Sequence, residues 1–228
     1  LVGTVSITGY TGNAYGRLLN NSITGNITLA DDAAYPAGYF TYIRNNVITG
    51  NCQFSINSNN AILDADFAGS GNKYVGNLTY IRNGGSIVAA SNEPNELSGN
   101  LILQSVSDIY LGKWIFSGNT NGMVEQLSSQ PVSIAEFTIQ KDAGSSVTLN
   151  DAVTISSAVI FSSGIINSSA GNELIFADNS IHWGSSANSY VNGPVVKTGN
   201  DPFTFPVGNL STYAPLSISA PDLPTDEF

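Results

Sequence analysis

Apolar and polar residues alternate at period two in short runs along most of the chain, and Gly, Asn and Ser interrupt these runs. Period-two alternation in brief segments is typical of β-strands with one buried face. The segment 126–141 has some helical character, but its Pro131 and β-branched residues favour a strand. The pattern therefore predicts an all-β protein made of many short strands, with clear examples at 22–29, 100–104, 146–150 and 153–161.

A Gly-Asn pair preceded by Thr, Ser or Val recurs along the chain, at Gly25, Gly50, Gly76, Gly99 and Gly118, with intervals of 25, 26, 23 and 19 residues. A unit of that length cannot bury its inner face alone, so neighbouring units stack and share one core. The spacing predicts a parallel β-solenoid (β-helix) with irregular turns, in which Gly fits the corners and Asn amides stack between turns. Two stacked antiparallel sandwiches are the alternative fold.

The composition is acidic and sparsely charged. Seven basic and 17 acidic residues give a net charge of −10, and Asn, Ser, Thr and Gly make up 94 of the 228 residues. Seven scattered basic residues do not form the cationic surface that nucleic acid or an anionic membrane requires, so we expect neither nucleic-acid binding nor direct membrane insertion. Cys52 is the only cysteine, so no disulfide forms within the chain.

Residues 133–228 carry a series of motifs that resemble large repetitive secreted surface proteins of the Bacteroidota type. In that family the Tyr-Val-Asn-Gly-Pro run ends a β-solenoid, and the Phe-rich run leads into a β-sandwich. The resemblance implies an adhesin-like protein that is exported to the bacterial cell surface, and it implies no catalytic residues. The first 130 residues resemble the family in repeat style only. The motifs are SGIIN at 163–167, GNELIF at 171–176, SYVNGPVVKTGN at 189–200, FTFPVG at 203–208 and APLSISA at 214–220.

Two parts are expected along the chain. Residues 1–196 form the β-solenoid repeats, and residues 197–228 form the exit from the solenoid, with a cap or the start of a truncated following β domain. The first residues have no Met and no signal-peptide pattern, so we expect an interior piece of a longer exported protein.

Asp64 and Asp66 are the candidates for a metal site or an acid/base pair. Strand alternation puts both carboxylates on one face, about 7 Å apart, which suits a hard cation or sugar cleavage. A solvated outer face explains the same pattern. His182 is the only histidine, so Ser-His chemistry and a zinc site of His and Cys both lack residues, and a structural role for His182 is favoured. We therefore expect no catalytic residue, no resident metal and no cofactor.

The sequence Thr-Tyr-Ile-Arg-Asn occurs twice, at 41–45 and 79–83. Alternation places Tyr42 with Arg44, and Tyr80 with Arg82, on one strand face. If these side chains point outward, a ring beside a guanidinium could bind a surface glycan or a protein partner. If they point inward, their stacking between turns only stabilises the sheet.

Three functions of different kinds follow from these observations. The first is a non-catalytic structural and adhesive module of a large exported cell-surface protein, which the repeats and the resemblance favour. The second is a carbohydrate-binding module, which needs a row of exposed aromatic rings, for which Tyr42, Tyr80, Tyr110 and Trp114 are candidates. The third is a β-helix polysaccharide lyase or hydrolase, which needs acids and bases gathered in one groove.

Overall fold

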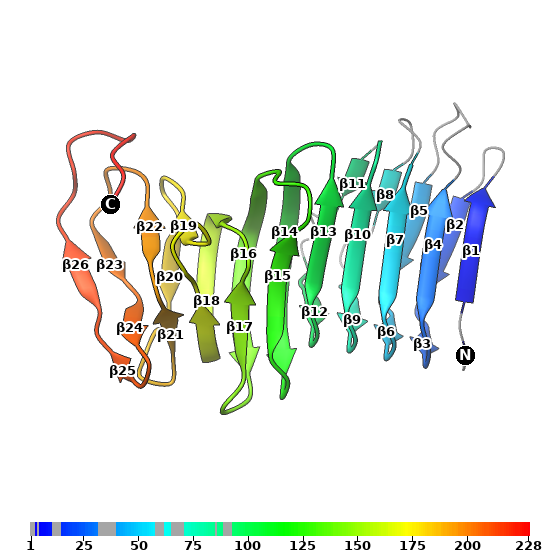
Figure 1. Cartoon of the computed structure of the whole chain (residues 1–228), viewed down its shortest axis with the longest axis horizontal. Coiled ribbons are helices and arrows are strands. Elements are labelled where there is room, and N and C mark those ends of the chain that lie inside the picture. The colour runs from blue at the N-terminus through cyan, green and yellow to red at the C-terminus, as the bar shows by residue number, and fades with distance from the viewer. Residues whose placement is uncertain are drawn as a thin grey trace.

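The computed structural model describes residues 3, 5–10, 15–31, 40–57, 62–64, 71–84, 86–88 and 93–228. Within these ranges the chain contains no helix and winds into stacked turns of parallel β-strands (Figure 1). The predicted fold class, an all-β parallel β-solenoid, is therefore confirmed.

The first wall of the coil is a column of parallel strands, of which β1 to β15 stand side by side on the near face of Figure 1. Ile27, Cys52, Leu78 and Leu101 are in register across this wall and all are buried, so each turn continues the same apolar row. The strands of the first wall are β1 (Val5–Tyr10), β4 (Ile27–Asp31), β7 (Cys52–Ile56), β10 (Leu78–Arg82), β13 (Leu101–Ser105), β15 (Gly122–Gln126), β17 (Ser146–Leu149), the second half of β18 (Val153–Asn167), β21 (Ser189–Asn192) and β24 (Val207–Asn209).

Two further walls complete each turn in the N-terminal half. The second wall is the sheet β2 (Tyr15–Leu19), β5 (Phe40–Arg44), β8 (Ile62–Asp64) and β11 (Ser86–Val88). The third wall consists of β3 (Ser22–Ile23), β6 (Val47–Ile48), β9 (Lys73–Tyr74), β12 (Asn95–Leu97), β14 (Ile109–Gly118), β16 (Val132–Lys141), the first half of β18, β19 (Leu174–Phe176), β20 (Ile181–Trp183) and β22 (Val195–Lys197).

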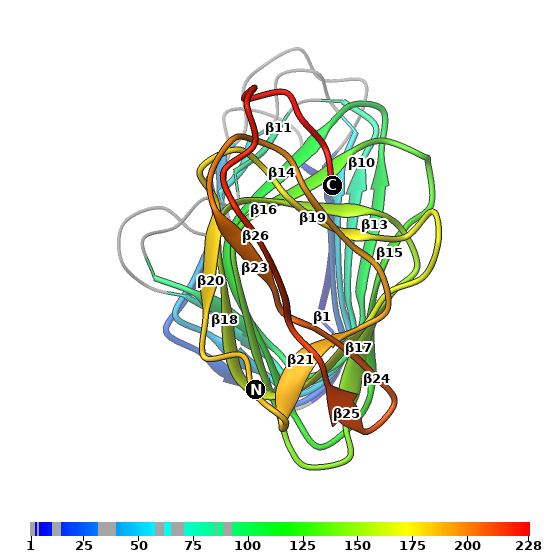
Figure 2. The same ribbon diagram turned by 90° about the vertical axis from the view of Figure 1, so that its left-hand side faces the viewer.

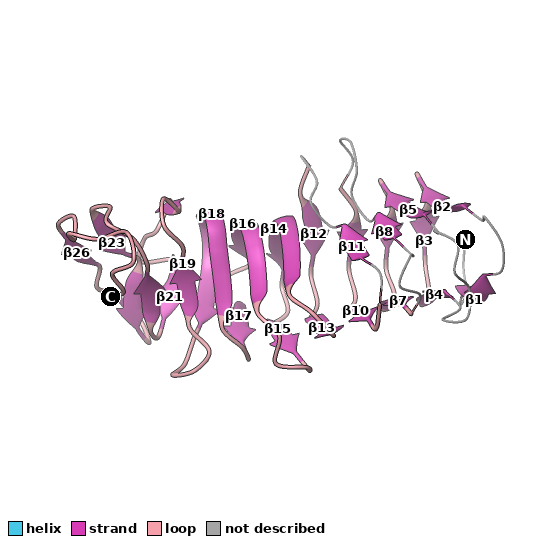
Figure 3. Cartoon of the chain, turned by 90° about the horizontal axis from the view of Figure 1, so that it is seen from above, coloured by secondary structure: helices cyan, strands magenta, loops and turns pink. Residues whose placement is uncertain are grey.

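Long strands replace the short ones in the middle of the chain. β14, β16 and β18 contain 10, 10 and 15 residues and lie side by side in Figure 3. β18 pairs with β16 in the third wall through Val153 and with β17 in the first wall through Ile165, so one strand rounds a corner without a break. The strand predicted within 126–141 is β16, so the strand interpretation of that segment is confirmed.

One corner of the coil is filled by glycine because successive turns approach too closely there for a side chain. A Cβ at Gly50, Gly76 or Gly99 would lie 2.2, 2.5 and 2.5 Å from the carbonyl oxygen of the glycine one turn earlier. Gly122 continues this column, since its Cβ would lie 2.8 Å from the carbonyl oxygen of Gly99. Gly118 was expected in the series and lies outside the column, because β14 is long and delays the corner by four residues.

Beside the glycine corner, asparagine side chains bridge the turns. We call Asn26, Asn51, Asn77 and Asn100 the outer asparagine ladder. The backbone N–H of each later member donates to the Oδ1 of the member one turn earlier, at 2.9, 2.9 and 3.0 Å. Met123 is the last donor, to Asn100 at 3.1 Å, and its side chain has no amide with which to continue the ladder.

A second set, the inner asparagine ladder, occupies the corner before the third wall and consists of Asn21, Asn46, Asn72 and Asn95. Here the backbone N–H of each earlier member donates to the Oδ1 of the next, at 3.0, 3.1 and 2.7 Å. Asn46, Asn72 and Asn95 are buried, so these bonds replace water that the backbone has lost. The predicted stacking of Asn amides between turns is confirmed at both corners.

The C-terminal end of the coil is closed by antiparallel strands. β23 (Phe203–Phe205) pairs with β26 (Leu216–Ile218), and the pair lies across the end of the coil in Figure 2. Phe203 and Phe205 are both 7% exposed and pack against the core. β24 pairs in parallel with β21 and antiparallel with β25 (Thr212–Tyr213), so stacking continues beyond residue 196. These strands are compatible with the predicted cap, and the boundary between 196 and 197 stays a prediction.

We expect Asn72→Ala to lower the free energy of unfolding by about 2–4 kcal/mol. The Asn72 side chain accepts from the backbone N–H of Asn46 at 3.1 Å and donates to the carbonyl of Ile43 at 2.8 Å, and it is 2% exposed. Its removal leaves buried backbone groups without these partners. Urea unfolding monitored by circular dichroism measures the change. In the control Asn83→Ala, which removes one exposed bond to Asn57, a loss above about 1 kcal/mol would contradict the role given to burial.

We expect Gly76→Ala to destabilise the coil by about 2 kcal/mol or more, because the backbone of Gly50 must move to admit the methyl group. The matched control is Gly144→Ala, whose Cβ would meet nothing within 4 Å and whose φ of 86° adds about 1 kcal/mol of backbone strain only. Equal losses in the two variants would show that close approach does not set the spacing of the turns.

Candidate functional site

The two copies of Thr-Tyr-Ile-Arg-Asn lie in different walls of the coil. The first copy is in β5 and pairs with β2 and β8 in the second wall, whereas the second is in β10 and pairs with β7 and β13 in the first wall. Their separation of 38 residues is longer than one turn and shorter than two. The structure therefore does not bring Tyr42, Arg44, Tyr80 and Arg82 together on one sheet.

Tyr80 is buried, so its place in a surface binding site was wrong. The side chain is 1% exposed, and its ring centroid lies 5.7 Å from that of Phe54 on the neighbouring turn and 6.5 Å from that of Trp114. The inward row Leu29, Phe54, Tyr80, Leu103 explains this position, because Tyr80 shares its strand face with buried Leu78. The alternative interpretation, stacking between turns, is the one that the structure shows for Tyr80.

The remaining members of that set are placed less deeply. Arg82 is half-buried, and its Nη1 donates to the backbone carbonyl of Asp108 at 3.1 Å. Arg44 is half-buried beside Ile43, which is 0% exposed. The backbone of Tyr42 belongs to β5, and its side chain lies outside the described part of the chain.

The acidic candidates fall at the limit of the described residues. The backbone of Asp64 ends β8, its side chain lies outside the described part, and Asp66 lies outside the described residues altogether. Across the described ranges, no three side chains of His, Cys, Asp or Glu gather as metal ligands would. Cys52 is a core residue, and burial raises the pKa of its thiol to about 12.

Two of the four lysines pair with glutamates on the adjacent strand of the third wall. Lys73 Nζ lies 2.7 Å from Glu96 Oε1, and Lys113 Nζ lies 3.6 Å from Glu136 Oε2. Although burial opposes ionisation of Glu96, hydrogen bonds from Lys73 and Ser117 outweigh it and lower the pKa of Glu96. Both lysines therefore tie neighbouring turns together on the outer face.

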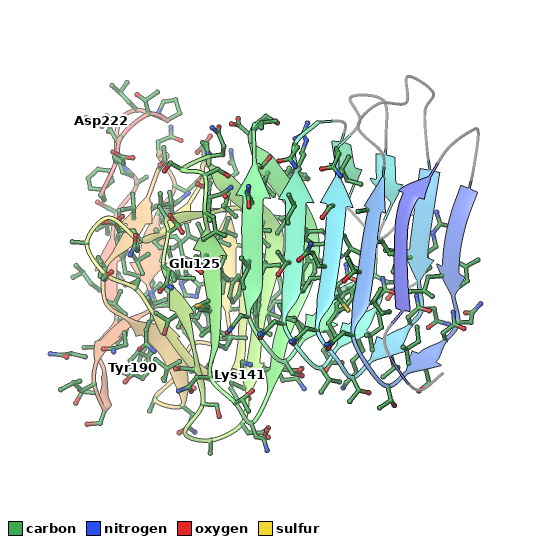
Figure 4. The ribbon with its side chains drawn as sticks, turned by 45° about the vertical axis from the view of Figure 1, so that its right-hand side comes forward. Glu125, Lys141, Tyr190 and Asp222 are labelled. Atoms are coloured by element: carbon green, nitrogen blue, oxygen red, sulfur yellow. The ribbon has the colours of Figure 1, made fainter. Side chains whose placement is uncertain are left out.

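The other two lysines are fully buried and donate to backbone carbonyls. Lys141, labelled in Figure 4 together with Glu125 of the first wall, donates to the carbonyls of Ser98 at 2.8 Å and Ser117 at 2.5 Å. Burial lowers the pKa of Lys141 to about 8, against a smaller opposing effect of Asp142. Lys197 donates to the carbonyls of Ala177 and Thr198, each at 2.9 Å.

His182 packs inside the C-terminal turn, as its structural interpretation predicts. Its ring centroid lies 5.8, 5.8 and 5.3 Å from those of Phe161, Phe176 and Phe203. Nε2 bonds to the backbone carbonyl of Thr204, which can only accept, so Nε2 carries the hydrogen. Burial lowers the pKa of His182, although the bond to Thr204 opposes this, and the imidazole is held neutral.

A groove of about 590 Å³ lies between β20 and β23, with His182 and Phe203 in its lining. β20 pairs with β18, β23 pairs with β26, and the His182 side chain joins β20 to β23 where a strand ladder would otherwise form. Asn179, Asp201 and Thr204 supply polar atoms to the lining. Asp201 Oδ2 accepts from the backbone N–H of Asn179 at 3.1 Å and lies 3.6 Å from Lys197 Nζ, so its carboxylate is held in place.

Exposed apolar side chains border this groove, and the sequence analysis missed them. On β20, Ile181 and Trp183 are 55% and 46% exposed, because inward-facing His182 turns its two neighbours outward. The only signal was the alternation in Ile-His-Trp. Of the aromatic residues considered for a carbohydrate site, Tyr110 is 53% exposed, whereas Trp114 is 0% exposed. The row of four exposed rings is therefore not formed.

Comparison with protein-family models, with curated proteins and with solved structures finds no match to this chain. In the part of the chain that the structure describes, no helix is long and apolar enough to cross a membrane. The groove between β20 and β23 and the exposed face beside it are the candidate functional site that geometry alone supports.

The buried ammonium of Lys141 predicts a pH dependence of stability. Its pKa is about 8 in the folded chain and 10.5 ordinarily, so between these values the unfolded chain holds a proton that the folded chain has released. The free energy of unfolding therefore rises with pH in this window, by about 2 kcal/mol from pH 7.5 to 9.5. The difference between the wild type and Lys141→Met in urea unfolding isolates this effect.

Lys113→Met is the control for this measurement, since Lys113 Nζ is paired on the outer face with a side chain that is 39% exposed. The stability of Lys113→Met should follow that of the wild type across the same pH range. If the Lys141→Met variant also follows the wild type, Lys141 titrates normally in the folded chain.

Proposed function

We propose that this chain is a non-catalytic structural and adhesive module of a large exported bacterial cell-surface protein. The observation that carries the proposal is the continuous stacking of turns, with one shared core and asparagine ladders at two corners. Stacking produces length by repetition, and each added turn fixes the position of the next. Such a coil suits a rigid spacer that holds contact residues away from a cell.

The surface of the coil supports the same proposal. Its net charge of −10 discourages self-association, and outward positions of the first wall include Thr28, Gln53, Thr79 and Glu125 in register. These side chains keep a flat sheet soluble without a high density of charge. The resemblance of residues 133–228 to exported surface proteins supports the location.

The placement of the basic side chains argues against a polysaccharide lyase in particular. A lyase needs a Lys, Arg or His free to take a proton beside a carboxylate. Lys73 and Lys113 are paired with glutamates, Lys141 and Lys197 donate to buried carbonyls, and His182 donates to Thr204. Each of these groups is engaged in holding the fold.

The proposal is tested by separating adhesion from turnover. Beads coated with the intact chain are passed over surfaces that carry polysaccharide or protein, and the same polysaccharides are incubated with the chain and assayed for new reducing ends and unsaturated products. We expect retention of the beads on at least one surface without any product. Beads coated with heat-unfolded chain serve as the control.

Two results contradict this function. Turnover of any polysaccharide by the purified chain would make it an enzyme. Failure of the folded chain to retain beads on every surface, at the level of the unfolded control, would remove the adhesive role.

A further inference from the structure

A flat apolar row crosses the outer face of the third wall. Strand pairing places Ile115, Thr138, Ile160 and Trp183 in register on β14, β16, β18 and β20. Ile115 and Ile160 are half-buried, Thr138 is 9% exposed, and Trp183 ends the row with its indole 46% exposed. Neighbouring strands lie about 4.8 Å apart, so the row offers a narrow, straight apolar track rather than a pocket.

Trp183 has no evident part in folding. The other tryptophan, Trp114, lies in the core against Tyr74, Tyr80 and Phe116, whereas Trp183 is outside the core cluster. Exposing an indole and Ile181 side by side on a regular strand carries a cost in water, unless something covers them. The strand is rigid here, because β20 is paired along its length with β18.

Polar groups stand next to the track in the groove between β20 and β23. The Thr204 hydroxyl, the Asp201 carboxylate and the Asn179 side chain face this groove of about 590 Å³. Lys197 and the Asn179 backbone hold Asp201, whose side chain is still 39% exposed and has a second oxygen to accept from a ligand. A ligand on Trp183 and Ile181 therefore meets hydrogen-bonding groups at its edge.

We propose that Trp183, Ile181 and the adjoining groove bind a neutral glycan. A sugar ring has an apolar face of C–H groups that stacks on an indole and a rim of hydroxyls that donate to carboxylates and amides. Asp178, Asp201 and the net charge of −10 oppose an acidic polysaccharide. A lipid or an apolar peptide would leave the groove's polar groups without partners. The inference rests on the proposed adhesive function and names its ligand class.

Affinity electrophoresis of the intact chain tests the inference. Native gels containing soluble glucan, xylan or mannan, or the acidic polymer polygalacturonate, are run with the wild type and with Trp183→Ala, Trp183→Phe and Tyr110→Ala. Tyr110 is the matched control, since it is an aromatic residue 53% exposed on the same wall. We expect at least one neutral polymer to retard the wild type and Tyr110→Ala equally, Trp183→Ala to bind at least 10-fold more weakly, and Trp183→Phe to recover part of the affinity.

Tryptophan fluorescence gives an independent measurement. Trp114 is 0% exposed, so a shift in emission on addition of a bound neutral oligosaccharide must come from Trp183, and Trp183→Phe should abolish it. Circular dichroism and thermal unfolding of Trp183→Ala should match the wild type, because the side chain lies outside the core.

Several results would overturn the inference. These are equal retardation of the wild type and Trp183→Ala, stronger binding to polygalacturonate than to any neutral polymer, and no retardation by any of the neutral polymers. If coated beads still adhere while Trp183→Ala behaves as the wild type, only the site is wrong. If the beads adhere to nothing, the proposed adhesive function fails as well.

Discussion

The spacing between turns at the corners is the constraint on which the rest of this structure depends. At the glycine corner, backbone meets backbone so closely that a Cβ at Gly76 would lie 2.5 Å from the Gly50 carbonyl oxygen. Next to it, asparagine amides bond from one turn to the next. Because both contacts act at every turn, the inward row from Ile27 to Leu101 and the outward rows on each wall stay in register.

Much of the fold could be predicted from the sequence, because local chemistry repeats at each corner. Alternation indicated strands, and the Gly-Asn pairs at Gly25 to Gly99 marked one corner of successive turns correctly. Gly118 broke the series, since the length of β14 depends on how the chain packs against β12 and β16 rather than on any local signal. Corner chemistry therefore predicts the fold class better than it predicts where each turn ends.

The candidate site was harder to predict, because a strand pattern does not say which face is inside. Tyr80 faces the core in β10, while in β5 the buried residue of the same five-residue sequence is Ile43. Identical sequences thus take opposite orientations according to their wall. Trp183 was missed for the same reason: its exposure follows from the inward position of His182, which depends on the distant rings of Phe161 and Phe203.

The asparagine ladders have a mechanical meaning for a molecule that bears load. Both ladders run in the N-terminal half and stop where β14, β16 and β18 begin to round the corners as unbroken strands. Under tension along the rod, we expect the short-stranded turns to peel away singly, since each contacts only its neighbours. One released turn of 25 residues extends to about 80–90 Å, so the N-terminal half would lengthen in steps while the long-stranded half keeps its shape.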